Sequence, residues 1–150
     1  NIQKLPYTVG DRLWVREAHA FDGPVVWHYA TDAVHELRRK RPSIFMPRWA
    51  SRLTLTVTDV RVQRVQEISE GDAQAEGIEK LKSGRGFYDP TLSHGAVHLG
   101  HYFTYATGAF ERLWDSLNAK RGFGWDKNPW VVAITFKPYQ INIDRMSSHD

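Results

Sequence analysis

Residues 41–60, RPSIFMPRWASRLTLTVTDV, combine two different sequence patterns in one segment. In the second half, leucine and valine alternate with threonine, a pattern typical of a strand with one buried face. We therefore predict a strand over residues 52–64. In the first half, Pro42 and Pro47 disfavour helical backbone in the residue before each of them, which keeps the chain extended. A long strand entered through an extended segment favours a fold built mainly from strands.

Shorter apolar stretches on both sides of this segment predict further strands. Apolar and polar residues alternate over 12–18, and a second short strand is expected over 25–32, after the turn pair Gly23-Pro24. Near the end of the chain, the sequence WVVAITF at 130–136 indicates a buried strand.

Two helices are predicted after the long strand. Ser69 is a suitable N-cap for a short helix over 70–76, with Asp72 as capping-box partner and Gly77 at the end. Apolar residues at spacings of three and four then predict a longer amphipathic helix that ends at Gly122. The residues expected in the core are Phe110, Leu113, Trp114, Leu117, Trp125 and Trp130.

Between the two helices, residues 82–108 are rich in Gly, Ser, His and Tyr and show no period, which predicts an irregular insertion. Strands outnumber helices, and closing a short sheet on itself removes its exposed edges. The expected fold class is therefore α+β: a small mixed β-barrel with peripheral helices, in a single domain over residues 1–150.

Composition and charge exclude several classes of protein and indicate one kind of partner. With 41% hydrophobic and 25% charged residues, the chain of 150 residues can bury a core, so wholesale disorder is excluded. The absence of cysteine excludes disulfides and thiolate metal sites and fits a cytoplasmic protein. No stretch approaches the roughly 18 apolar residues of a membrane span. Residues 1–64 hold 11 Lys/Arg and 6 Asp/Glu, so we expect a polyanion to meet that half of the chain.

The strongest candidates for ligand binding are Arg48, Trp49 and Arg52, which stand where the chain enters the long strand. Guanidinium groups bind phosphates bidentately and an indole ring stacks on a base, a combination that suits single-stranded nucleic acid or a nucleotide. The alternative is structural: Trp49 would cap the core while the two arginines pair with carboxylates. Both interpretations stay open for Trp49.

Other charged groups are weaker candidates. Arg16 and Glu17 end the first predicted strand, where alternation sends them to opposite faces, as ligand contacts or as members of ion pairs. The basic run at 38–41, RRKR, would contact phosphates without sequence preference or remain a solvated surface.

Neither a metal site nor a cofactor is predicted. His94, His98 and His101 have a spacing that would align them on a helix, but the glycines around them disfavour that helix. The segment SGRGFYDP at 83–90 lacks the Gly-Lys-Ser/Thr end of a phosphate-binding loop.

Three segments, taken in order, resemble a known family. GDRLWVRE at 10–17 and the long stretches over 42–78 and 110–136 resemble phage and prophage proteins of the ASCH type. The likeness covers about half the chain. It implies the PUA-like β-barrel of that family and binding of RNA or nucleotides.

Some small ASCH proteins resemble amidohydrolases that deacylate a modified cytidine with a lysine, a threonine and a glutamate. Matching ISEGDAQAEGI to the corresponding family segment places that glutamate at Glu76. The Gly-x-Lys-Thr segment that supplies the other two residues has no counterpart before Gly10, so we expect a chain truncated at its N-terminus or one without this activity.

Three functions are therefore considered. The first is a module that binds RNA, single-stranded nucleic acid or a modified nucleotide through Arg48, Trp49 and Arg52, with Arg16 and Glu17 nearby. The second is an amidohydrolase that acts on an acylated cytidine through Glu76. The third is a phage-encoded factor that binds a host protein.

Overall fold

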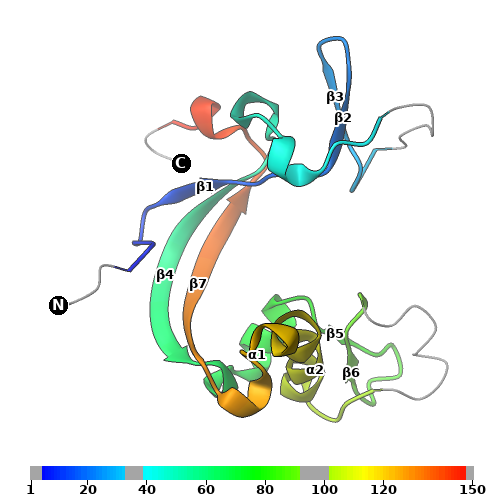
Figure 1. Ribbon diagram of the computed structural model, residues 1–150, viewed down its shortest axis with the longest axis vertical. Coiled ribbons are helices and arrows are strands. Elements are labelled where there is room, and N and C mark those ends of the chain that lie inside the picture. The colour runs from blue at the N-terminus through cyan, green and yellow to red at the C-terminus, as the bar shows by residue number, and fades with distance from the viewer. Residues whose placement is uncertain (1–4, 33–38, 92–101, 148–150) are drawn as a thin grey trace. The chain divides into compact units, whose positions relative to one another are not determined.

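The computed structural model describes residues 5–32, 39–91 and 102–147 (Figure 1). Its contacts divide the chain into two compact units. Unit 1 comprises Asn1–Arg61 and Ile134–Asp150, and unit 2 comprises Val62–Ala133. Each unit is described by itself below, and the single domain expected from the sequence stays a prediction.

A three-stranded sheet contains the long strand of the opening segment. Its order is β1-β4-β7, with β1 at Arg12–Trp14, β4 at Thr54–Arg64 and β7 at Trp130–Tyr139. The pair β1 and β4 is antiparallel, with Leu13 opposite Leu55. The strand predicted over 52–64 is confirmed, whereas β1 ends earlier than the alternation over 12–18 indicates.

β7 confirms a strand at 130–136, but the prediction that it is buried is wrong. Trp130 is 62% exposed and Phe136 is 48% exposed. An unbroken apolar run does not show which of its faces the sheet will cover. Thr135, on the opposite face from Trp130 and Phe136, is exposed as well, so both faces of β7 keep exposed side chains.

Unit 1 also contains a β-hairpin and two short 3₁₀ turns. β2 (His19–Asp22) pairs antiparallel with β3 (Val25–His28) across a turn in which Gly23 has φ 57°. The turns η1 (Ser43–Phe45) and η2 (Arg48–Ala50) interrupt the segment that Pro42 and Pro47 were expected to keep extended. A proline disfavours helical backbone only in the residue before it, and each turn begins directly after one.

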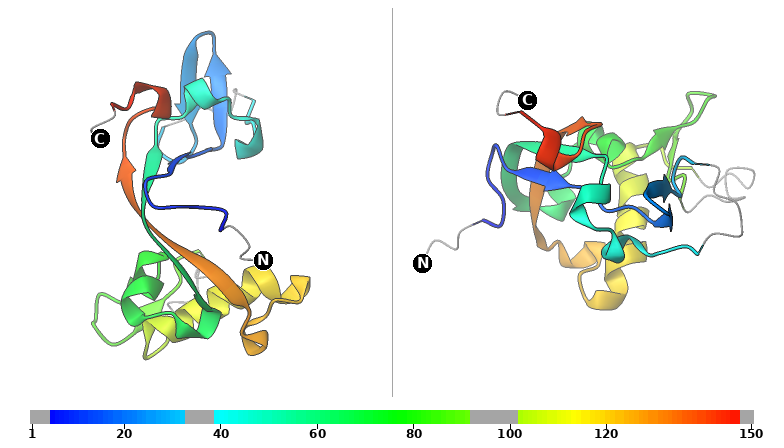
Figure 2. Two further views of the ribbon diagram at one scale, coloured as in Figure 1. Left: turned by 90° about the vertical axis from the view of Figure 1, so that its left-hand side faces the viewer. Right: turned by 90° about the horizontal axis from the view of Figure 1, so that it is seen from above.

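Unit 2 is built around two helices, α1 (Glu70–Ala75) and α2 (Ala106–Asn118), which contact each other (Figure 2). The predicted start of α1 is confirmed, because the Ser69 hydroxyl accepts a hydrogen bond from the Asp72 amide at 3.0 Å. Gly77 ends α1 with φ 99°, a left-handed conformation that glycine tolerates best. The long helix was predicted to end at Gly122 but ends at Asn118, and Gly122, with φ 83°, ends the 3₁₀ turn Ala119–Arg121 that follows it.

The remaining elements are short. β5 (Glu79–Lys80) and β6 (Phe87–Tyr88) form a two-stranded antiparallel sheet in unit 2. The 3₁₀ turns η3 (Val65–Glu67), η5 (Ala119–Arg121) and η6 (Trp125–Lys127) also belong to unit 2, and η7 (Ile143–Arg145) to unit 1. The irregular insertion predicted over 82–108 is therefore too broad, since it includes β6 and the start of α2.

An apolar cluster stabilises unit 2. Its buried members come from η3, α1, α2 and the segment between α1 and β5: Val65, Ala73, Ile78, Ala106, Ala109 and Phe110. Leu113, Trp114 and Trp125 pack against this cluster as predicted. Leu117 and Trp130, expected in the core, are 64% and 62% exposed. Leu117 lies one turn beyond Leu113, where α2 has passed the cluster.

The described strands do not close into a barrel. They form one three-stranded sheet and two two-stranded sheets, and β2 and β3 pair only with each other among these sheets. The α+β class is confirmed as a mixed structure with antiparallel sheets and few helices, and the closed barrel is not. In the described part of the chain, no helix is long and apolar enough to span a lipid bilayer.

Candidate nucleic-acid interface

Trp49 lies on the surface of unit 1, within η2, and is 61% exposed. Its ring faces that of Phe21 on β2, with centroids 5.6 Å apart and an interplanar angle of 31°. The exposed fraction excludes the interpretation that Trp49 fills the core. A ring packed on one neighbour and open to solvent elsewhere can stack on a flat ligand.

The backbone under Trp49 is held by one side chain. The Asn142 amide nitrogen lies within donor distance of three carbonyl oxygens, at 2.8 Å from Arg48, 3.3 Å from Trp49 and 2.7 Å from Ser51. Its amide oxygen in turn accepts a hydrogen bond from the Asp144 amide at 3.0 Å. A side chain that bridges these groups fixes η2 in place, so Trp49 is exposed on a pre-ordered turn.

A cation adjoins the same aromatic pair. The Arg41 guanidinium carbon lies 5.2 Å from the ring centroid of Phe21, within the range of a cation–π interaction. Arg41 is positioned by backbone hydrogen bonds in both directions with His19, at 2.8 and 3.1 Å. The basic run at 38–41 thus contributes one member to this surface. We call Phe21, Arg41 and Trp49 the aromatic surface of unit 1.

Arg48 does not point to an open site but pairs with Asp144. The Arg48 Nη2 atom lies 2.8 Å from Asp144 Oδ1, and its Nε donates to the same oxygen at 2.8 Å. This hydrogen bond raises the pKa of Arg48 and lowers the pKa of Asp144. The two side chains are 51% and 54% exposed, so water and salt weaken the pair, and a phosphate could compete for the guanidinium.

Arg52 pairs with Glu17, and its guanidinium makes more hydrogen bonds than that of Arg48. Its Nε and Nη2 donate to the two Glu17 carboxylate oxygens at 3.0 and 2.8 Å, and its Nη1 donates to the Thr31 hydroxyl at 2.7 Å. The hydrogen bonds from Arg52 hold the pKa of Glu17 below its usual value, although burial acts in the opposite direction. Arg52 and Glu17 therefore form a structural ion pair, the alternative that the sequence left open.

The Arg52 pair continues into hydrogen bonds around Asp32. The Thr31 hydroxyl donates to Asp32 Oδ1 at 3.0 Å, and the His28 amide donates to Asp32 Oδ2 at 2.7 Å. The His28 amide, and then the Thr31 hydroxyl, lower the pKa of Asp32. Thr31, Asp32 and His28 were not predicted from the sequence. The feature of the sequence that could have indicated them is the polar end of the segment 25–32, which was predicted as a strand.

Arg16 and Glu17 do not bond to each other, as their alternation predicts. Arg16 is exposed, stacks 4.7 Å from the ring centroid of Trp14, and donates from Nη1 to the carbonyl of Ile44 at 3.3 Å. It belongs to unit 1, and its role as a ligand contact stays a prediction.

Glu76 belongs to unit 2, where it is exposed at the C-cap of α1. Arg48, Arg52 and Trp49 belong to unit 1. The catalytic role of Glu76 stays a prediction.

His94, His98 and His101 lie outside the described residues. Within the described ranges, no three His, Asp or Glu side chains are grouped as a metal ion would require.

Comparison with known proteins adds no information about these residues. No model of a known family matches the chain. No curated protein and no solved structure is significantly similar to it.

Proposed function

We propose that unit 1 binds RNA, another single-stranded nucleic acid or a modified nucleotide. The observation that carries this proposal is Trp49, a large aromatic side chain that is 61% exposed on a turn ordered by Asn142. Stacking of a base on an aromatic ring is worth about 1–3 kcal/mol and does not depend on the base. Because the turn is already ordered, little conformational entropy is lost on binding.

The charge of unit 1 favours a polyanionic ligand. Its residues hold 12 Lys/Arg and 8 Asp/Glu, a net charge of +4, whereas unit 2 holds 8 and 9, a net charge of −1. Arg41 lies against Phe21, where its guanidinium can reach a phosphate next to a stacked base. Arg48 is a second contact if the phosphate displaces Asp144.

The geometry changes the proposed role of Arg52. Its donors are used by Glu17 and Thr31, so it supports the turn rather than contacting the ligand. The resemblance of residues 42–78 to ASCH proteins supports the same general function, and we include in the proposal the PUA-like barrel and the phage origin that the resemblance implies.

The proposal is tested by fluorescence anisotropy with a short labelled single-stranded RNA. Trp49→Ala should weaken binding about tenfold, the effect of losing one stacked base. The matched control is Trp130→Ala, because Trp130 is the same residue type, is 62% exposed and belongs to unit 2. Raising the salt concentration from about 50 to 200 mM should weaken wild-type binding steeply, because phosphate contacts release counterions.

Two outcomes would contradict the proposal. One is the absence of binding to every RNA or DNA oligonucleotide tried. The other is equal loss of affinity in the two tryptophan variants, which would remove the assignment to Trp49.

A further inference from the structure

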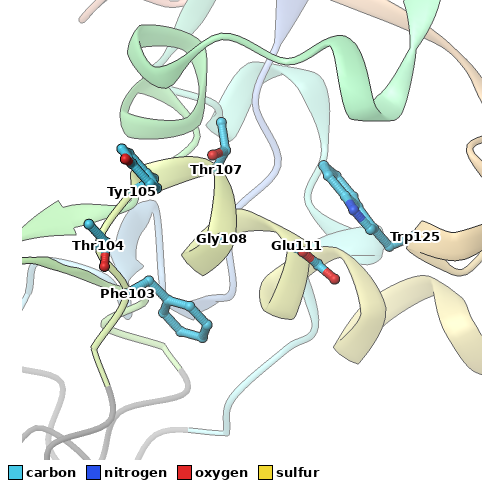
Figure 3. A pocket seen from close by; sticks show the side chains of 7 residues that line it. All are labelled: Phe103, Thr104, Tyr105, Thr107, Gly108, Glu111 and Trp125. Atoms are coloured by element: carbon cyan, nitrogen blue, oxygen red, sulfur yellow. The ribbon is translucent and has the colours of Figure 1, made fainter.

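A pocket with a volume of about 290 Å³ opens at the start of α2, within unit 2 (Figure 3). Its lining includes the aromatic side chains of Phe103, Tyr105 and Trp125 and the carboxylate-bearing Glu111. Figure 3 shows Glu111 on α2 between Phe103 and Trp125. None of these four residues belongs to the aromatic surface of unit 1.

Two of the three aromatic residues in the lining, Phe103 and Trp125, are fixed by their neighbours. Phe103 lies against Gly108 of α2, so closely that a Cβ at this position would come within 3.2 Å of the Phe103 ring. The Trp125 amide donates to Asp115 Oδ1 at 2.7 Å, and the Trp125 carbonyl accepts from Gln66 Nε2 at 2.8 Å. The absence of a side chain at Gly108 therefore leaves space for Phe103, while two hydrogen bonds hold the backbone of Trp125.

Among the described residues that line the pocket, Glu111 is the one with a charged side chain. The hydrogen bonds and ion pairs among the described residues leave the exposed Glu111 carboxylate without a partner. The backbone amides in the first turn of a helix attract anions. In α2 these amides are already bound by Glu70, whose carboxylate accepts from the Ala106 amide at 2.7 Å and from the Thr107 amide at 3.1 Å. A second carboxylate thus lies beside the lining residue Thr107, and the site disfavours an anionic ligand.

We propose that this pocket binds a small organic ammonium cation, with the positive group against the faces of Phe103, Tyr105 and Trp125 and beside the Glu111 carboxylate. Aromatic faces attract cations through their quadrupole, and an alkylated ammonium is the cation that they favour because its hydration is weak. The volume lies at the lower limit of ligand pockets, which begin at about 300 Å³, so a head group fits better than a larger ligand. This inference is independent of the proposed function, because it concerns another unit and a ligand of opposite charge.

The test uses choline as the cation and, as its neutral counterpart, the alcohol in which a tert-butyl group replaces the trimethylammonium. Binding to the full chain is followed by NMR through the indole N–H signal of Trp125. Choline should shift this signal saturably, while the neutral alcohol and sodium chloride at equal concentration should not. Glu111→Gln should weaken choline binding roughly fivefold, because it removes one charge at close range in a solvated site.

Glu76→Gln is the matched control, because it removes an exposed carboxylate of unit 2 that does not line the pocket. Tyr105→Ala provides a second test, since Tyr105 is 65% exposed and its removal leaves the fold intact while weakening choline binding. Equal binding of the neutral alcohol would show an apolar pocket without charge recognition. Unchanged binding in Glu111→Gln, or no saturable shift with choline, would overturn the proposal.

Discussion

Units 1 and 2 are stabilised in different ways. Unit 2 buries a contiguous apolar cluster in which Phe110 contacts Trp114 and Trp125, with ring centroids 6.2 and 6.1 Å apart. Unit 1 buries several polar groups, including His19 and Thr54, and depends on side-chain hydrogen bonds such as those of Arg52 and Asn142.

The difference teaches how a small chain combines stability with a binding surface. The apolar cluster contributes a part of the stability of unit 2 that does not depend on pH, because the burial of its apolar side chains involves no titrating group. Hydrogen bonds and ion pairs fix unit 1 without burying its aromatic rings, which leaves Phe21 and Trp49 available to a ligand. Three substitutions test this contrast.

The largest effect is expected in the apolar cluster. Phe110→Ala should lower the free energy of unfolding by about 3 kcal/mol, because it removes a ring that is only 8% exposed and leaves a cavity. Urea unfolding measured by circular dichroism gives the value. Leu117→Ala on the same helix is the control, since Leu117 is 64% exposed and its loss should cost at most about 0.5 kcal/mol. Similarly large costs for the two variants would mean that the packed part of this helical face extends to Leu117.

The second effect concerns the ion pair of unit 1. Arg52→Ala should lower the free energy of unfolding by about 1–3 kcal/mol, because it leaves the Glu17 carboxylate, 12% exposed, without its partner. Arg48→Ala is the control, because its pair with Asp144 is half exposed and its loss should hardly change stability. If Arg48→Ala proved the more costly, the assignment of structural and accessible arginines would be reversed.

The Arg52 effect should also depend on pH. Arg52 lowers the folded-state pKa of Glu17, so its stabilisation is complete above the usual glutamate pKa and is lost as the pH falls through the lowered value. The difference in stability between wild type and Arg52→Ala should therefore be constant near neutral pH and should shrink below about pH 4. A difference that persists in acid would mean that Arg52 acts through packing rather than through the pair.

The smallest effect is expected at the junction of α1 and α2. Glu70→Ala should cost about 1 kcal/mol, because it removes the acceptor for the first amides of α2. The Thr107 hydroxyl and these amides lower the pKa of Glu70, so this contribution too is lost as the pH falls. Unfolding of Glu70→Ala is compared with that of Glu76→Ala, which removes an exposed carboxylate from the C-cap of α1 and should leave stability unchanged. Equal stability in the two variants would exclude a capping role for Glu70.

Local signals predicted the helices and the long strand well. The Ser69 cap, Gly77 and the threonine alternation in β4 all act between neighbours in the chain, so they could be recognised without the fold. The start of α2 at Ala106 was missed because its first turn is capped by Glu70, which lies 36 residues earlier.

Exposure was less predictable than secondary structure. Phe110 and Leu117 share one helical face, yet the first is buried and the second is not, because the apolar cluster ends before α2 does. Trp130 was expected in the core but is stacked 4.2 Å from the Arg64 guanidinium at the surface. Periodicity gives the face of an element, whereas the length of its contact with a neighbour depends on packing.

By itself, the sequence determined the local structure: where strands and helices form, where glycine ends them, and which half of the chain is basic. Only the tertiary structure decided which charges are free to meet a ligand. Arg48 and Arg52 are equivalent in the sequence, but residues 96 and 35 positions away separate them into an exposed pair with Asp144 and a bidentate pair with Glu17. The physical reason is that an ion pair depends on distance in space, which the order of residues does not give.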